Sequence, residues 1–213
     1  MTKGKAGARL RVTNLNAGLG VFFAVFFAVF FAGLCAGSRP AALLAGQAHA
    51  AARPRAGDRA PSFTLKSVDK GEARTLDRLV KDGATRGVVI VFVSSKCPYV
   101  AQARQPLAEL FRTYGNKVAF VGVNANQNES ADDIKADASA NFPFPMLRDE
   151  GAKVADLYGA ERTPEAFLVD ASGVIRYHGG VAELGAALGE FTAGHAVAKA
   201  EARAFGCTIK RRP

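Results

Sequence analysis

A run of six apolar residues, 88–93, is the centre of the predicted fold. Most of its residues are β-branched, and a run this short and this apolar is typical of a strand buried on both faces of an α/β sheet. A polar turn, residues 94–96, follows it, and then Pro98 comes directly after Cys97. Because proline is favoured in the first turn of a helix, we expect a helix over residues 98–114 with Cys97 as its N-cap.

The rest of the pattern predicts strands that alternate with helices. Strands are expected over residues 62–68, 117–124, 165–170 and 174–178. Helices are expected over residues 75–81, 130–141, 151–158 and 181–191. Alternation of this kind is typical of a parallel βαβ core, and the last two strands, which a glycine-containing turn joins, indicate an antiparallel hairpin at its edge. The pattern therefore predicts an α/β fold whose mixed central sheet is flanked by helices.

The first 50 residues have the pattern of a targeting segment. Four basic residues among the first eleven precede an uncharged stretch over residues 12–38, and no Asp or Glu occurs before Asp58. A basic start followed by an apolar stretch is typical of an export signal, and Ala48-His49-Ala50 suits cleavage after Ala50. The apolar part, residues 17–37, is also long enough to cross a bilayer as an uncleaved anchor. We therefore expect an exported protein, periplasmic or otherwise extracytoplasmic, that contacts a membrane only through this segment if it is not cleaved.

Composition divides the remaining chain into three parts. Residues 51–57 are an Ala/Arg/Pro linker, residues 58–193 form the predicted domain, and residues 194–213 form a tail that carries Cys207. The formal net charge is +9, but the leader holds five of the 28 basic residues and no acidic one, which leaves 23 basic against 19 acidic residues. These are spread along the chain without the basic stripe that nucleic-acid binding needs, so we expect no nucleic-acid partner.

The predicted position of Cys97 gives its thiol a reactive setting. A side chain at a helix N-cap lies beside unpaired backbone N–H groups and the positive end of the helix dipole, and both favour the thiolate over the thiol. Lys96 adds a positive charge next to it. The thiolate is the nucleophilic form of cysteine. The alternative is a buried structural cysteine, since a free cysteine also behaves as a small hydrophobic residue.

Four motifs resemble the thioredoxin-like superfamily, and within it the redoxin (AhpC/TSA-type, peroxiredoxin-like) branch. Cys97-Pro98-Tyr99-Val100 resembles the thioredoxin active site C-x-x-C, with valine in place of the second cysteine. Thr163-Pro164 before an apolar run resembles the cis-proline strand of that superfamily. The stretch 57–65 resembles the start of the redoxin branch, and Gly206-Cys207-Thr208-Ile209-Lys210 resembles a tail of some redoxin proteins. The resemblance implies a thioredoxin-like three-layer fold over about residues 57–210.

The resemblance to thioredoxins also implies a substrate site around Cys97. It places the substrate beside Pro98 and Tyr99 at the start of the helix. It also places the substrate against the backbone of Thr163 and Pro164, which enter the strand expected after them. In that arrangement the Thr163–Pro164 peptide bond is cis and faces Cys97, and we expect the same here.

The resemblance to peroxiredoxins implies further site residues. Peroxiredoxins carry Thr or Ser three residues before the reactive cysteine, and Ser94 fits that pattern. They also carry a proline seven residues before it, and Ile90 departs from that pattern. A distant arginine holds the peroxide in these proteins, and the candidates here are Arg162 and Arg148.

Three functions are compatible with these residues. In the first, Cys97 reduces a hydroperoxide, becomes a sulfenic acid and condenses with Cys207. In the second, Cys97 exchanges with the disulfides of exported proteins or small molecules, and Cys207 or an outside thiol resolves the mixed disulfide. In the third, the domain is a non-catalytic binding module in which a Cys97–Cys207 disulfide only fastens the tail. The first two need an external thiol reductant, and we expect neither a metal nor another cofactor.

Cys207 is the second predicted catalytic residue. Residues 194–213 carry little apolar periodicity after Phe205, and no strand is expected there. Gly206 lets the backbone approach another surface closely. We therefore predict a mobile tail that brings Cys207 to an oxidised Cys97, and the alternative is a disordered tail with an idle cysteine.

Overall fold

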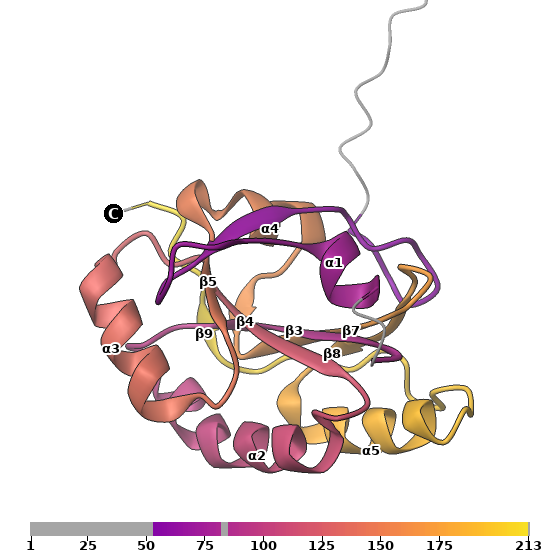
Figure 1. Ribbon diagram of the computed structural model, residues 1–213. Helices are drawn as coiled ribbons and strands as arrows, with labels where there is room; N and C mark the ends of the chain where they lie inside the picture. The colour runs from indigo at the N-terminus through magenta and orange to yellow at the C-terminus, as the bar shows by residue number, and fades with distance from the viewer. Residues whose placement is uncertain (1–52, 82–84, 213) are drawn as a thin grey trace, which may run out of the picture. The chain divides into compact units, whose positions relative to one another are not determined.

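The computed structural model describes residues 53–81 and 85–212. The predicted leader, residues 1–50, lies outside the described residues, and so do its expected cleavage and its alternative role as an anchor. Within the described ranges, no helix combines the length and the apolar character needed to cross a membrane. Figure 1 shows a central sheet with helices on both of its faces.

The main sheet has seven strands in the order β2-β1-β5-β4-β3-β7-β8. Their bounds are β1 Thr64–Ser67, β2 Ala73–Thr75, β3 Gly87–Val93, β4 Ala119–Asn124, β5 Met146–Arg148, β7 Glu165–Asp170 and β8 Ile175–Gly179. β3 is parallel to β4, and β4 is parallel to β5, whereas β7 is antiparallel to both β3 and β8. The mixed sheet confirms the predicted fold class. The short strands β2 and β5 were not predicted.

The helices form two layers around this sheet. Their bounds are α1 Leu76–Lys81, α2 Pro98–Tyr114, α3 Ala131–Asn141, α4 Lys153–Tyr158 and α5 Val181–Thr192, with the 3₁₀ helix η1 at Glu150–Ala152. α1 and α4 pack on one face of the sheet, and α2, α3 and α5 pack on the other (Figure 1). Helices, sheet and helices make three layers, which is the thioredoxin-like arrangement.

Strand β3 lies near the centre of the sheet and is buried on both faces. Its even-numbered residues from Val88 to Phe92 pack into the core with α1 and α4, and its odd-numbered residues from Val89 to Val93 pack into the core with α2 and α5. All of them are at most 2% exposed. Because both faces meet apolar side chains, the sequence of this strand shows no alternation.

Helix α2 begins directly after the turn that follows β3. Cys97 is its N-cap and Pro98 lies in its first turn, as predicted. Val100, Ala103 and Leu107 form its buried face. This strand–turn–helix connection places Cys97 at the carboxyl end of a central strand, the edge at which open α/β sheets carry their ligand sites.

The expectation that the tail forms no strand is wrong. β9 Cys207–Thr208 pairs antiparallel with β6 Arg162–Thr163 in a separate two-stranded sheet. Further upstream, the backbone of residues 200–202 bonds to that of His178 in β8, and further downstream Ile209 is buried. Backbone hydrogen bonds hold this segment, and they do not depend on a pattern of apolar side chains. The lack of apolar periodicity therefore did not exclude a strand. The tail is packed in the same compact unit as the sheet.

Candidate active site

Cys97 follows the turn after β3 and is only 3% exposed. Its Sγ donates a hydrogen bond of 3.2 Å to the carbonyl oxygen of Thr163. The Thr163–Pro164 peptide bond is cis, as predicted. The contact with Thr163 places this bond beside the cysteine, so the structure brings together the two motifs on which the thioredoxin resemblance depends.

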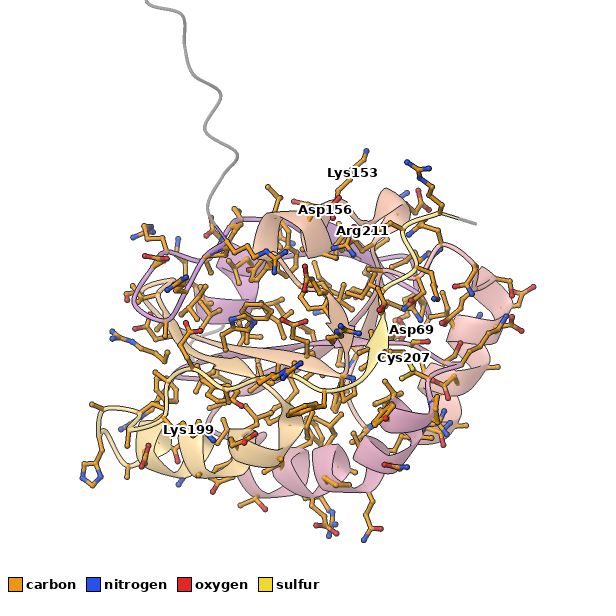
Figure 2. All side chains as sticks on the ribbon, turned by 180° about the vertical axis from the view of Figure 1, so that it is seen from behind. Asp69, Lys153, Asp156, Lys199, Cys207 and Arg211 are labelled. Atoms are coloured by element: carbon orange, nitrogen blue, oxygen red, sulfur yellow. The ribbon has the colours of Figure 1, made fainter. Side chains whose placement is uncertain are left out.

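Cys207 lies on β9, directly opposite Thr163 in the antiparallel register. It therefore meets the same residue whose carbonyl contacts Cys97. Cys207 packs against the apolar cluster that contains Cys97, and the two thiols lie close enough for each to shift the pKa of the other. Both cysteines are free thiols in this structure. Two cysteines that are far apart in the sequence thus form a pair at the start of α2, and Figure 2 shows Cys207 on its short strand.

Gly206 allows the tail to lie against β6. A Cβ atom at this position would be 2.0 Å from the carbonyl oxygen of Thr163 and 2.7 Å from its carbonyl carbon. Both are backbone atoms, which cannot rotate out of the way as a side chain can. Only glycine lets two backbones come this close, so Gly206 determines how near Cys207 comes to Cys97.

Polar contacts fasten the tail beyond β9. The amide of Lys210 donates to Asn126 Oδ1 at 2.9 Å, and its carbonyl accepts from the amide of Gln127 at 2.7 Å. Arg211 Nε donates to Asp156 Oδ1 of α4 at 2.6 Å, and Figure 2 shows these two residues side by side. These contacts hold the strand that carries Cys207 while both thiols are reduced.

The surroundings lower the pKa of Cys97 and raise that of Cys207. Burial by itself raises the pKa of the Cys97 thiol, but hydrogen bonds from Cys207, the Thr163 hydroxyl and the Val100 amide favour its thiolate and bring the pKa below its ordinary value. Burial, the hydrogen bond with Cys97 and the charge of its thiolate raise the pKa of Cys207 to about 11. At neutral pH, Cys97 is therefore the better nucleophile of the two.

Glu129 is a buried carboxylate that sequence reasoning missed. It accepts hydrogen bonds from the hydroxyls of Ser94 and Ser95, from the Ser95 amide at 2.9 Å and from Asn124 Nδ2 at 2.8 Å. Burial raises the pKa of Glu129, but these bonds outweigh it and hold the pKa below its ordinary value. Because Ser94 and Ser95 form the turn that presents Cys97, the charged Glu129 fixes the shape of that turn.

Ser94 and Arg162 have protein partners in this structure. Ser94 Oγ donates to Glu129 and accepts from the amide of Lys96 at 3.2 Å. Arg162 Nη1 donates to Thr208 Oγ1 on the tail at 3.0 Å. The two side chains hold the turn and the tail in place, and the substrate contact expected of them stays a prediction.

Arg148 and Lys96 are also engaged with the protein. Arg148 Nη1 donates to the carbonyl oxygen of Asn126 at 2.8 Å, so it holds the loop after β4. Lys96 Nζ lies 3.4 Å from Asp133 Oδ2 of α3. The charge of Lys96, which was expected to act on Cys97, is therefore paired at the surface, and the low pKa of Cys97 comes from the hydrogen bonds to its sulfur.

The other predicted contact residues are open to solvent. Pro98 is exposed, and Tyr99 is 51% exposed beside the cysteine pair. Tyr99 also lines a hollow of about 460 Å³ between α2 and α5, together with Leu110 and Val181. A molecule that approaches the thiols thus has these side chains of α2 available for contact.

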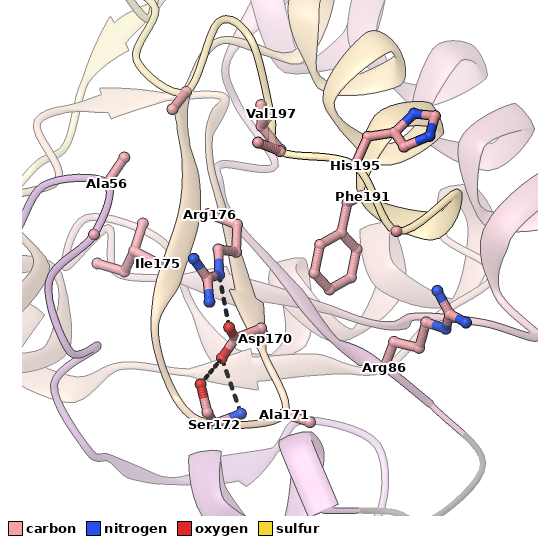
Figure 3. A pocket seen from close by; sticks show the side chains of 14 residues that line it. Ala56, Arg86, Asp170, Ala171, Ser172, Ile175, Arg176, Phe191, His195 and Val197 are labelled. Atoms are coloured by element: carbon pink, nitrogen blue, oxygen red, sulfur yellow. Dashed lines mark hydrogen bonds and ion pairs between the residues drawn. The ribbon is translucent and has the colours of Figure 1, made fainter.

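A hollow of about 660 Å³ lies at the opposite end of the sheet (Figure 3). It is lined by Asp170, which pairs with Gly87 at the start of β3, whereas Cys97 follows the end of that strand. His195 lines this distant hollow, so it is separate from the thiols. Across the residues that the structure describes, no group of three or more His, Cys, Asp and Glu side chains could hold a metal ion.

The two thiols are expected to react in different pH ranges. In the reduced protein, alkylation of Cys97 by iodoacetamide should have its inflection below the ordinary thiol pKa, and alkylation of Cys207 should rise only as the pH approaches about 11. In the Cys97→Ala variant, the hydrogen bond and the thiolate charge are gone, so the pKa of Cys207 should fall part of the way to its ordinary value. Peptide mass spectrometry over a pH series measures both profiles. An unchanged Cys207 profile in the variant would contradict the contact.

The fold and the cysteine pair beside a cis-proline place the chain among the thioredoxin-like redox proteins. More narrowly, it belongs to the AhpC/TSA family, whose model matches residues 56–178. The matched region contains Cys97, Thr163 and Pro164, and Cys207 lies outside it. The family match thus covers Cys97 and its surroundings, and it is the structure that places Cys207 beside them.

The relatives carry the names of redox proteins. The chain is 30% identical over 132 residues to the Thiol-disulfide oxidoreductase ResA of Halalkalibacterium halodurans, with 61% of this chain and 72% of the relative covered. It is also 30% identical over 132 residues to Peroxiredoxin Q, chloroplastic, of Oryza sativa subsp. japonica, with 57% of each chain covered. A solved structure of an uncharacterized conserved protein from Geobacillus kaustophilus has a TM-score of 0.68 at 28% identity, with 76% of this chain and 95% of that chain covered. These similarities support a thioredoxin-like redox function in general.

Proposed function

We propose that the protein is a thiol-dependent oxidoreductase that acts on disulfides, with Cys97 as the nucleophile and Cys207 as the resolving cysteine. The observation that carries the proposal is the placement of two free thiols beside the same residue, because Cys97 bonds to the Thr163 carbonyl and Cys207 pairs with Thr163 across β6 and β9. Val100 occupies the position of the second cysteine of a C-x-x-C motif, and Cys207 supplies the missing thiol from the tail. The printed name of the ResA relative, a thiol-disulfide oxidoreductase, supports the same reaction type.

The reaction consists of two exchange steps. The Cys97 thiolate attacks one sulfur of the substrate disulfide, the sulfur–sulfur bond breaks, and the other half leaves as a thiolate that takes up a proton. Cys207 then loses its proton, attacks Cys97 Sγ in the mixed disulfide and releases the second substrate thiolate. The substrate gains two electrons, and the protein ends with a Cys97–Cys207 disulfide. An external thiol reductant returns both cysteines to the reduced state.

Reduction of a peroxide is the second candidate. The resemblance to a peroxiredoxin Q favours it, and the same pair of thiols suits it. The Cys97 thiolate would attack one peroxide oxygen, release an alcohol or water and become a sulfenic acid, and Cys207 would then form the disulfide and release water. Against this candidate, both guanidinium groups are already bonded to protein oxygens, Arg148 to Asn126 and Arg162 to Thr208.

A structural disulfide in a binding module fits the geometry less well. A disulfide breaks more readily when the departing thiol has a low pKa, and the pKa of Cys97 lies below its ordinary value. A bond that serves only to fasten the tail would be more durable between two thiols of ordinary pKa. The low pKa of Cys97 therefore supports a pair that opens and closes.

The protein acts outside the cytoplasm in this proposal. The support is the sequence of its first 50 residues, with a basic start, an apolar stretch and an A-x-A pattern before residue 51. Disulfide chemistry is common in oxidising compartments such as the bacterial periplasm. An uncleaved segment over residues 17–37 would attach the same domain to the membrane.

The test compares two oxidants on the reduced full chain. One equivalent of glutathione disulfide or of hydrogen peroxide is added, and the products are mapped as non-reduced peptides. We expect a Cys97–Cys207 disulfide that dithiothreitol reverses, and faster formation with the disulfide than with the peroxide. Faster formation with peroxide favours the second candidate. A Cys97 that yields only sulfinic acid, or only links between chains, would overturn the role of Cys207, and an internal disulfide that resists thiol reductants would indicate the binding module.

A further inference from the structure

Strand β7 carries a carboxylate at each end. Glu165, its first residue, follows Pro164 on the side of Cys97, and Asp170, its last residue, lies at the opposite end of the sheet. Glu165 is 5% exposed and Asp170 is 8% exposed. A buried carboxylate is costly unless it is hydrogen-bonded, so the contacts of each one indicate what it holds in place.

Glu165 holds the turn that precedes it. Its Oε2 accepts hydrogen bonds from the backbone amides of Glu161 and Arg162, both at 2.8 Å. Thr163 follows these two residues directly, and its carbonyl meets the sulfur of Cys97. The same turn forms β6, on which β9 pairs. One carboxylate oxygen therefore fixes both the carbonyl beside the nucleophile and the strand that receives the tail.

His178 of β8 holds Glu165 from the other side. Its Nε2 lies 2.7 Å from Glu165 Oε1, and its ring stacks on Phe167 with 4.2 Å between the ring centroids. Its Nδ1 lies 3.7 Å from Glu201 Oε2, on the segment that leads to β9. The backbone of His178 also bonds to residues 200–202 on that segment. One imidazole thus connects the turn before the cis-proline with the part of the tail that delivers β9.

We infer that Glu165 and His178 are positioning residues for the cysteine pair: they hold β6 at the place where the Thr163 carbonyl meets Cys97 and where β9 brings Cys207 alongside. Their effect passes through the backbone of residues 161–163. The inference rests on the proposed function for what the pair of thiols does, and on the contacts above for where the thiols lie.

Asp170 offers a matched control on the same strand. Its Oδ1 accepts from the amides of Ser172 and Val174 at 2.9 Å each, and its Oδ2 accepts from Arg176 Nε at 2.6 Å. Figure 3 shows Asp170 with Ser172 and Arg176. Like Glu165, it is a buried carboxylate that holds a turn and pairs with a side chain of β8. It differs in its distance from the thiols, because it lies at the far end of the sheet.

The test compares Glu165→Met and Glu165→Gln with the control Asp170→Leu. In Glu165→Met, the turn loses its acceptor, so disulfide formation between Cys97 and Cys207 should slow by about tenfold or more. The alkylation inflection of Cys97 should also move to higher pH, since its thiolate loses hydrogen bonds. Glu165→Gln keeps an acceptor for the turn and should restore both readouts. Asp170→Leu should lower the denaturation midpoint and leave both thiol readouts as in the unaltered protein.

A milder pair of variants keeps the inference testable if Glu165→Met does not fold. His178→Leu removes the partner of Glu165, and His178→Gln retains a donor, so only the first should shift the Cys97 profile. If Glu165→Met and Asp170→Leu lose stability alike and leave the alkylation profile of Cys97 unchanged, Glu165 stabilises the fold and does not position the cysteine pair. A failure of the unaltered protein to form the internal disulfide would count against the proposed function instead, while the alkylation profiles still decide the positioning role.

Discussion

Replacing Cys97 with serine is expected to abolish the catalysed reduction of disulfides while the protein keeps its fold. The hydroxyl of serine stays protonated at neutral pH. The variant therefore lacks an anionic nucleophile in the place of the Cys97 thiolate. We expect a loss of about 10³-fold or more in rate, because the covalent step depends on this one nucleophile. The measurement is reduction of glutathione disulfide with an excess of thiol reductant, and circular dichroism checks the fold.

The Cys207→Ser variant is the matched control for this result. Its Cys97 still completes the first exchange, so it should stop at a mixed disulfide and release one substrate thiol per chain. The trapped species adds the mass of one glutathione to the peptide that contains Cys97. Turnover by Cys97→Ser at the rate of the unaltered protein would contradict the assignment of Cys97 as the nucleophile. So would a mixed disulfide on Cys207 of Cys97→Ser together with none on Cys97 of Cys207→Ser.

The Gly206→Ala variant is expected to lose the internal disulfide although it retains both cysteines. The added Cβ would lie 2.0 Å from the carbonyl oxygen of Thr163, and both backbones are fixed at this point, so the tail must move away from β6. Overpacking of this kind lowers the free energy of unfolding by about 1–3 kcal/mol. The alkylation inflection of Cys97 should then move to higher pH, because its thiolate loses the hydrogen bonds from Cys207, and oxidant should produce overoxidised Cys97 or links between chains. Peptide mapping and denaturant unfolding measure these effects.

The Gly189→Ala variant is the control for a methyl group added to glycine. Gly189 lies in α5, and its added Cβ would have the hydroxyl of Tyr114 at 3.5 Å as its nearest neighbour, which is an ordinary contact. Alanine is the better helix former by about 1 kcal/mol, so this variant should be as stable as the unaltered protein or more so. If Gly206→Ala behaves like this control and forms the Cys97–Cys207 disulfide normally, the tail does not depend on the close approach at Gly206.

The part of the site that is local in the sequence could be predicted. The apolar run of β3, the polar turn and Pro98 after Cys97 form one continuous stretch, and each feature has a physical cause that acts over a few residues. The buried strand, the start of α2 and the N-cap position of Cys97 follow from that stretch alone. The cis-proline beside Cys97 needed the family resemblance, because its distance from the cysteine depends on how two distant segments fold together.

The parts that depend on distant pairing could not be predicted. β9 has only two residues, too few to show a period, and it is held by backbone hydrogen bonds that every residue except proline can donate. Glu129 reads as a surface residue in a polar loop, and its burial depends on donors from the turn before α2 and from Asn124 at the end of β4. The same limit applies to Glu165, whose role depends on its contact with His178 across the hairpin.

The position of β9 late in the chain order has a consequence for biosynthesis. A nascent chain that has emerged only as far as α5 contains every strand of the seven-stranded sheet but lacks the strand that pairs with β6. During that interval Cys207 is not yet available to Cys97, which can link to the thiols of other chains. Docking of β9 ends the interval, so the order of the elements delays the pairing of Cys97 with Cys207 until after the sheet and α5 have emerged.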